Sequence, residues 1–163
     1  MSIELIKDKL WYKVSKYIRY LLGEYSGYLE KEILKIISEN QDKEKYLCIL
    51  NICNILNVST EGWKIFEKII ENASENDTEI LNEIDCMIFN TGSCCGEYGI
   101  VNSFKEKETF FKSLKSKNQK VKKFIEEEKE RYNYMYLDEK KDVDKKIIYK
   151  NVENQITKRY EKK

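Results

Sequence analysis

Two adjacent cysteines, Cys94 and Cys95, lie in the glycine-bracketed stretch NTGSCCGEYG, where thiol chemistry is the first possibility to weigh. Thiolates bind zinc or take part in redox reactions. Zinc sites, however, use separated pairs such as C-x-x-C, or histidines. We therefore predict a connection between helices whose glycines supply positive φ angles, with Tyr98 packed on it, and no metal or cofactor. The alternative is a partner-binding loop that includes Tyr98.

Histidine is absent from the 163 residues. It is the commonest general base near neutral pH and the commonest metal ligand. Its absence excludes Ser-His-Asp and Cys-His catalysis and the usual zinc proteases. We therefore predict that the chain is not an enzyme.

Carboxylates cluster between residues 61 and 85, where only Lys64 and Lys68 oppose them. A hydrolase with paired carboxylates needs two acids in one cleft, and this pattern singles out no pair. One interpretation is a solvated helix face, and the other is an acidic docking surface for a basic partner. The residues assigned to that docking surface are Glu75, Asp77, Glu79 and Glu83.

Aromatic residues are dense near the N-terminus, where one tryptophan and five tyrosines occur between residues 11 and 28. This number exceeds what one face of two helices can bury. Tyrosine is enriched at protein interfaces because it combines a large area with a polar tip. Core packing and an interface role both remain open, and the interface candidates are Tyr12, Tyr20 and Tyr25.

Charge is divided along the chain, although the net charge is only +1. Residues 1–103 hold 11 basic and 17 acidic side chains, and residues 104–163 hold 19 and 12. Lysines crowd residues 115–123, and tyrosines follow at 132, 134 and 136. Such a region can bind single-stranded nucleic acid, or its lysines can pair with the interleaved acids on an exposed helix.

Helical periodicity runs through nearly the whole sequence, and there is no proline to interrupt it. Residues 43–56 are the most apolar and predict a buried, central helix. Ser103 and Glu106 have the spacing of a capping box and predict the start of a helix. The expected helices cover residues 2–22, 28–40, 43–56, 61–72, 77–89, 103–114 and 120–137, followed by a charged C-terminal helix within 138–163.

Short polar turns between sequential helices indicate antiparallel neighbours. We therefore predict an all-α fold, a HEAT-like or irregular α-solenoid or helical bundle of about seven or eight helices. The expected organisation is one domain over residues 1–163, with a possible boundary near residue 42.

Three pieces of the sequence carry a resemblance to a known family: Trp63 opening a helix, the run TGSCCGEYG, and NQKVKKFIEEEKERY. From about Lys43 to Tyr136 the chain resembles the divergent HEAT-like repeats near the C-terminal ends of bacterial conflict and defence proteins. The resemblance implies an α-solenoid that binds other macromolecules and carries over no catalytic residue. The first 42 residues lie outside it, and the prolines usual in such repeats are missing.

These observations favour a non-catalytic, protein-binding module. We expect an immunity or inhibitor protein of bacterial or phage conflict, whose protein partner has a basic docking surface. The alternative is a nucleic-acid-binding accessory protein that uses the basic C-terminal region. The sequence has neither an apolar run of membrane-spanning length nor a secretory signal, and its five cysteines are scattered. We therefore expect a cytoplasmic location without membrane contact.

Overall fold

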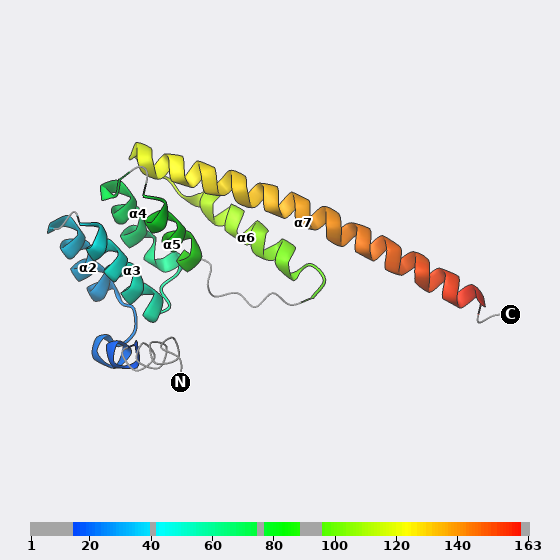
Figure 1. Cartoon of the computed structure of the whole chain (residues 1–163), viewed down its shortest axis with the longest axis horizontal. Helices are drawn as coiled ribbons and strands as arrows, with labels where there is room; N and C mark the ends of the chain where they lie inside the picture. Colours follow the sequence, from blue (N-terminus) through cyan, green and yellow to red (C-terminus); the bar gives the residue numbers. More distant parts are fainter. Residues whose placement is uncertain (1–14, 40–41, 75–76, 89–95, 161–163) are drawn as a thin grey trace, which may run out of the picture. The chain divides into compact units, whose positions relative to one another are not determined.

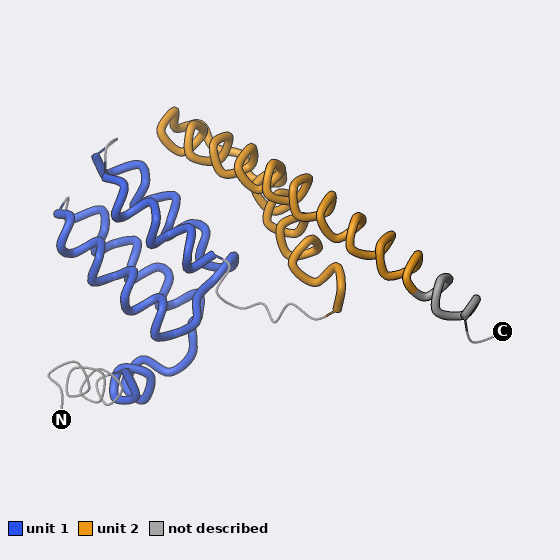
Figure 2. The backbone as a smooth tube through the Cα atoms, turned by 45° about the vertical axis from the view of Figure 1, so that its right-hand side comes forward, with its two compact units in different colours: residues 1–91 blue, residues 92–163 orange. Residues whose placement is uncertain are grey.

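The computed structural model describes residues 15–39, 42–74, 77–88 and 96–160, with side chains to residue 153. All regular structure in these ranges is helical, which confirms the all-α prediction. The chain divides into two compact units, residues 1–91 and residues 92–163 (Figure 2). The prediction of a single domain, with a boundary near residue 42, stays a prediction.

The described part of the first unit consists of short helices (Figure 1). Its first described helical residues are 15–22. Each later helix agrees with its predicted range to within one or two residues. The elements are α2 (Gly27–Glu39), α3 (Lys43–Ile55), the 3-10 turn η1 (Thr60–Gly62), α4 (Trp63–Asn72) and α5 (Thr78–Ile88).

The four helices α2 to α5 form two stacked pairs. Helix α2 packs against α4, and α3 packs against α5, so the first helices of the two pairs meet each other and so do the second helices. Ion pairs join the same partners, because Lys64 on α4 contacts Glu30 on α2 and Lys43 on α3 contacts Glu79 on α5. This is the stacking expected of an α-solenoid.

Isoleucine dominates the core of this unit. Ile37, Ile65, Ile69 and Ile84 are completely buried, and burial of each such side chain contributes about 1.5–3 kcal/mol. The prediction that α3 is a buried central helix is wrong in part. Its buried face is lined by Tyr46, Ile49, Leu50, Cys53 and Ile55, whereas Cys48 and Asn51 on the other face are exposed.

The second unit is a helical hairpin of α6 (Gly99–Ser113) and α7 (Gln119–Tyr160). Helix α6 begins four residues before the predicted start, so Ser103 lies inside the helix and is not its cap. The two predicted C-terminal helices are one continuous helix of 42 residues. Neither glycine nor proline interrupts it, and i to i+3 ion pairs such as Lys145–Asp142 support its exposed surface.

An aromatic cluster holds α6 against α7. The Phe111 ring stacks on Tyr132 at 5.9 Å and meets the Phe124 ring edge-on at 6.0 Å. Glu108 precedes Phe111 by three residues on α6; its side chain is 1 % exposed and forms ion pairs with Lys105 and Lys112. The two lysines hold the pKa of Glu108 below its ordinary value. A buried carboxylate of α6 is therefore kept charged.

Candidate partner-binding surface

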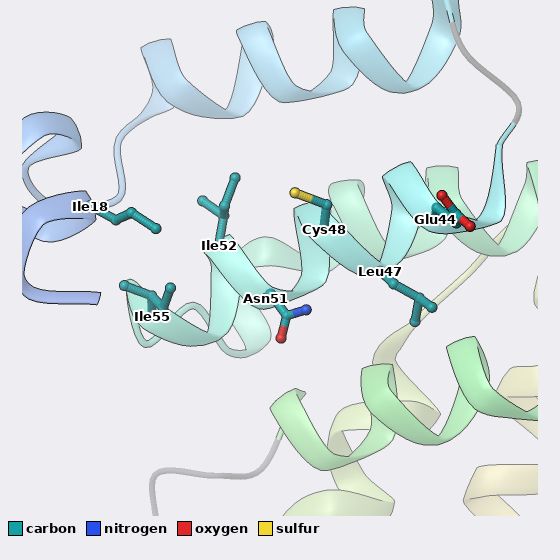
Figure 3. Close-up of a pocket in the computed structure, with 7 residues that line it drawn as sticks. All are labelled: Ile18, Glu44, Leu47, Cys48, Asn51, Ile52 and Ile55. Carbon is teal, nitrogen blue, oxygen red and sulfur yellow. The ribbon is translucent and has the colours of Figure 1, made fainter. Parts of the chain in front are cut away.

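An open groove runs along α3 in the first unit. Its volume is about 370 Å³, and Figure 3 shows its lining side chains, six from α3 and one from residues 15–22. Ile18 reaches the C-terminal end of α3, next to Ile52 and Ile55 (Figure 3). The lining is mostly apolar, and its residues are Ile18, Glu44, Leu47, Cys48, Asn51, Ile52 and Ile55.

Arg19 fixes residues 15–22 at that end of α3. Its Nε donates a hydrogen bond to the carbonyl oxygen of Ile55, and its Nη2 donates to Asn57 Oδ1 at 3.0 Å. The last carbonyls of a helix lack partners within the helix, and a cation there also interacts favourably with the helix dipole. Arg19 therefore serves as a side-chain cap for α3, a role that the sequence analysis did not identify.

One face of residues 15–22 is apolar and exposed. Tyr17, Tyr20 and Leu21 have the i, i+3, i+4 spacing of one helix face, and they are 69 %, 85 % and 77 % exposed. We call these three residues the tyrosine face. Tyr28 and Ile36 on α2 add further exposed apolar area to the same unit. Tyr20 was one of the named interface candidates. Tyr17 belonged to the N-terminal aromatic set for which core packing and an interface role were both left open, and Leu21 was not an interface candidate.

Tyr25, another predicted interface residue, makes contacts within the first unit. The Tyr25 hydroxyl donates to Glu30 Oε2 at 2.8 Å, and Lys64 donates to Glu30 Oε1 at 3.0 Å. Burial, together with the bond to Glu30, raises the pKa of Tyr25. Tyr25 is half-buried, and its hydroxyl is linked through Glu30 to the ion pair between α2 and α4. Tyr12 lies outside the described residues.

Tyr98 belongs to the second unit and precedes α6. Its hydroxyl donates a hydrogen bond to Asp144 on α7, and this bond raises the pKa of the hydroxyl. Tyr98 therefore connects the beginning of α6 to α7. A role for it in partner binding stays a prediction.

The predicted acidic docking residues have different surroundings. Lys43 Nζ lies 2.9 Å from Asp77 Oδ1 and 2.8 Å from Glu79 Oε2, and the two carboxylates raise the pKa of Lys43. The Asp77 side chain is only 10 % exposed. Glu83 is exposed, and Glu75 lies outside the described residues. Lys43 therefore offsets part of the acidic charge, and docking through these residues stays a prediction.

Three cysteines fall within the described residues, and all three are free thiols. Cys48 and Cys86 are exposed, whereas Cys53 is buried and burial raises its pKa to about 12. Among the residues that the structure describes, no three Cys, Asp or Glu side chains are grouped closely enough to hold a metal ion. Cys94 and Cys95 lie outside them, so their predicted structural role is not tested.

None of the helices in the described ranges is long and apolar enough to cross a membrane. No protein-family model matches the chain, and comparisons with curated proteins and with solved structures return no match. The resemblance to HEAT-like repeats of conflict proteins therefore stays a prediction. The groove on α3 and the tyrosine face form the candidate site on the evidence of their geometry alone.

Proposed function

We propose that the chain is a non-catalytic protein-binding module, an immunity or inhibitor protein of bacterial or phage conflict that binds its partner stoichiometrically in the cytoplasm. The exposed tyrosine face is the observation that carries this proposal. Complete burial of a large apolar side chain contributes about 1.5–3 kcal/mol, and tyrosine is among the residues that dominate interface energetics. A partner that covers Tyr17, Tyr20 and Leu21 would gain this contribution.

The groove on α3 supports the same conclusion. Ile18, which lines the groove, belongs to the same helical residues as the tyrosine face. Interfaces concentrate their binding energy where one partner inserts a side chain into a desolvated pocket. We therefore expect the partner to insert an apolar side chain between Ile18 and α3 while its neighbouring residues cover the tyrosines.

Charge favours a partner with a basic rim. Residues 1–91 hold 11 basic and 16 acidic side chains, and Glu44 stands at the edge of the groove. Complementary charge around an apolar centre accelerates association and disfavours wrong partners. The assignment to conflict systems rests on the resemblance to HEAT-like repeats described above.

Co-expression with the product of the neighbouring gene tests the proposal. We expect that product to inhibit growth alone and to be neutralised by this chain in a one-to-one complex. The double variant Tyr20→Ala/Leu21→Ala should bind at least about tenfold more weakly, because hot-spot residues contribute 2 kcal/mol or more. Tyr134→Ala/Leu137→Ala is a matched control, because both residues are exposed on α7 in the other unit.

Different outcomes would contradict the assignment of the interface to the tyrosine face and the proposed protein-binding function. Equal binding by both variants would show that the tyrosine face is not the interface. If neither the neighbouring product nor any purified protein partner binds the folded chain, the proposed function itself is wrong. Circular dichroism of both variants checks that the helices are intact.

A further inference from the structure

Positive charge is concentrated at the turn between α6 and α7. Residues 92–163 hold 19 basic and 13 acidic side chains, and this excess is not evenly spread. Between residues 109 and 125 there are six lysines and neither an aspartate nor a glutamate. We call these six residues the lysine tip: Lys112, Lys115, Lys117, Lys120, Lys122 and Lys123.

Local hydrogen bonds fix the shape of this turn. The Ser116 Oγ accepts a bond from the Asn118 N–H at 3.2 Å, and Asn118 Oδ1 accepts one from the Lys120 N–H at 2.9 Å. Directly after the turn, Val121 and Phe124 are buried, the latter against Phe111. The lysines are therefore carried on a defined hairpin end, which lowers the cost of ordering them on binding.

Half of the six tip lysines form no ion pair within the described part of the chain. Lys112 pairs with the buried Glu108, and Lys123 Nζ lies 3.9 Å from Glu127 Oε1. Lys115, Lys117 and Lys122 are exposed and form no ion pair with any residue that the structure describes. The tip thus presents several cations that an external anion can contact.

The surroundings of the lysine tip distinguish between classes of anionic partner. Between residues 101 and 133, all of them described, no large apolar side chain is exposed. Helices that lie on membranes need an apolar face to insert, and protein interfaces are depleted in lysine and enriched in aromatic residues. A membrane surface and an acidic protein are therefore less favoured as ligands of the lysine tip than the phosphate backbone of a nucleic acid.

No aromatic ring between residues 101 and 133 is among the exposed large side chains, which favours a double strand over a single strand as the ligand. Binding of single strands relies on bases that stack on exposed rings. The nearest exposed ring along α7 is Tyr134, eleven residues after Lys123, or about 16 Å along a helix. We propose that the lysine tip binds the phosphate backbone of a nucleic-acid duplex without reading its sequence. This activity is independent of partner binding by the first unit.

Titration of the full chain with a fluorescein-labelled DNA duplex of mixed sequence tests the proposal. Duplex affinity should fall steeply between about 50 and 200 mM salt, because each phosphate contact releases counterions. In Lys115→Gln/Lys117→Gln/Lys122→Gln, loss of three contacts should lower the slope of log K against log salt by about 2.7. The matched control Lys35→Gln/Lys141→Gln/Lys146→Gln loses the same charge at exposed positions elsewhere and should retain the wild-type slope.

Competition identifies the ligand class. Unlabelled duplexes of unrelated sequence should displace the probe equally, and polyglutamate or phosphatidylserine vesicles of equal charge should displace it poorly. The proposal is overturned if the wild-type chain does not bind the duplex at low salt. It is also overturned if the two triple variants lose affinity equally, or if polyglutamate or the vesicles compete as well as the duplex does.

Discussion

Arg19 and Ile55 are joined across 36 residues of sequence by a hydrogen bond from the guanidinium Nε to the carbonyl oxygen at the end of α3. The three preceding carbonyls of α3 accept bonds from the backbone N–H groups of Leu56, Asn57 and Val58. Arg19 therefore supplies the donor that the backbone does not, and it seats Ile18 in the groove. The position of the candidate site depends on this contact.

Replacement of Arg19 by methionine should loosen residues 15–22 while leaving the stacked helix pairs folded. A hydrogen bond from a charged group contributes about 1.5–3 kcal/mol, so local opening of this segment should become at least about tenfold more frequent. Hydrogen exchange of the amides of residues 15–22 measures this. The same change at exposed Lys16 is the control, and equal exchange in the two variants would contradict the proposed anchor.

The sequence predicted much of the first unit because its helix boundaries have local causes. Asp42 accepts a hydrogen bond from the Glu44 N–H at 3.1 Å and caps α3 as a short acidic residue should. In the second unit, the predicted start of α6 and the predicted end of the helix after residue 137 were wrong, because no local signal marks either position. Tyr98, at the N-cap of α6, makes no side-chain capping bond, and no residue type marks the continuity of α7.

The candidate site was less predictable because periodicity shows which helix face is apolar but not whether another helix covers it. Leu47, Cys48 and Ile52 belonged to the apolar pattern of α3 and were expected to be buried, yet they line an open groove. The Arg19–Ile55 contact spans 36 residues and has no local signal beyond the rarity of arginine, which occurs only three times in the chain.

Gly62→Ala should destabilise the first unit. An added Cβ would lie 2.3 Å from Val58 Cγ1 and 3.3 Å from Phe66 Cζ, so the joint between α3 and α4 must shift. Overpacking of this kind costs about 1–3 kcal/mol. Urea unfolding followed by tryptophan fluorescence measures it, since Trp63 directly follows Gly62 in this unit. Gly27→Ala, which meets nothing within 4 Å, should be neutral or slightly stabilising.

Glu108→Gln should weaken the hairpin of α6 and α7 at neutral pH, by about 1–3 kcal/mol, because Lys105 and Lys112 lose their buried anionic partner. The pKa of Glu108 is lowered in the folded state, so its stabilisation is present above the unfolded value of 4.5 and is lost as the pH falls through the folded pKa.

Amide exchange in α6, measured from neutral pH to below pH 4.5, checks both statements. The wild-type hairpin should lose stability on acidification by more than the Glu108→Gln variant does. Exposed Glu106 provides the control, since Glu106→Gln should retain the wild-type pH dependence. Parallel pH profiles for wild type and Glu108→Gln would show that the buried carboxylate is not the group responsible.

Alkylation of the native chain by iodoacetamide should distinguish the cysteines by their surroundings. Cys48 in the groove and Cys86 on α5 are exposed and should react, whereas Cys53 should stay unmodified until the protein unfolds. Burial raises the pKa of Cys53 to about 12, so only about 10⁻⁴ of it is thiolate at pH 8. A bound partner whose side chain occupies the groove should protect Cys48 and leave Cys86 reactive. Mass spectrometry of peptides resolves the two sites, and unchanged labelling of Cys48 in a saturated complex would place the interface elsewhere.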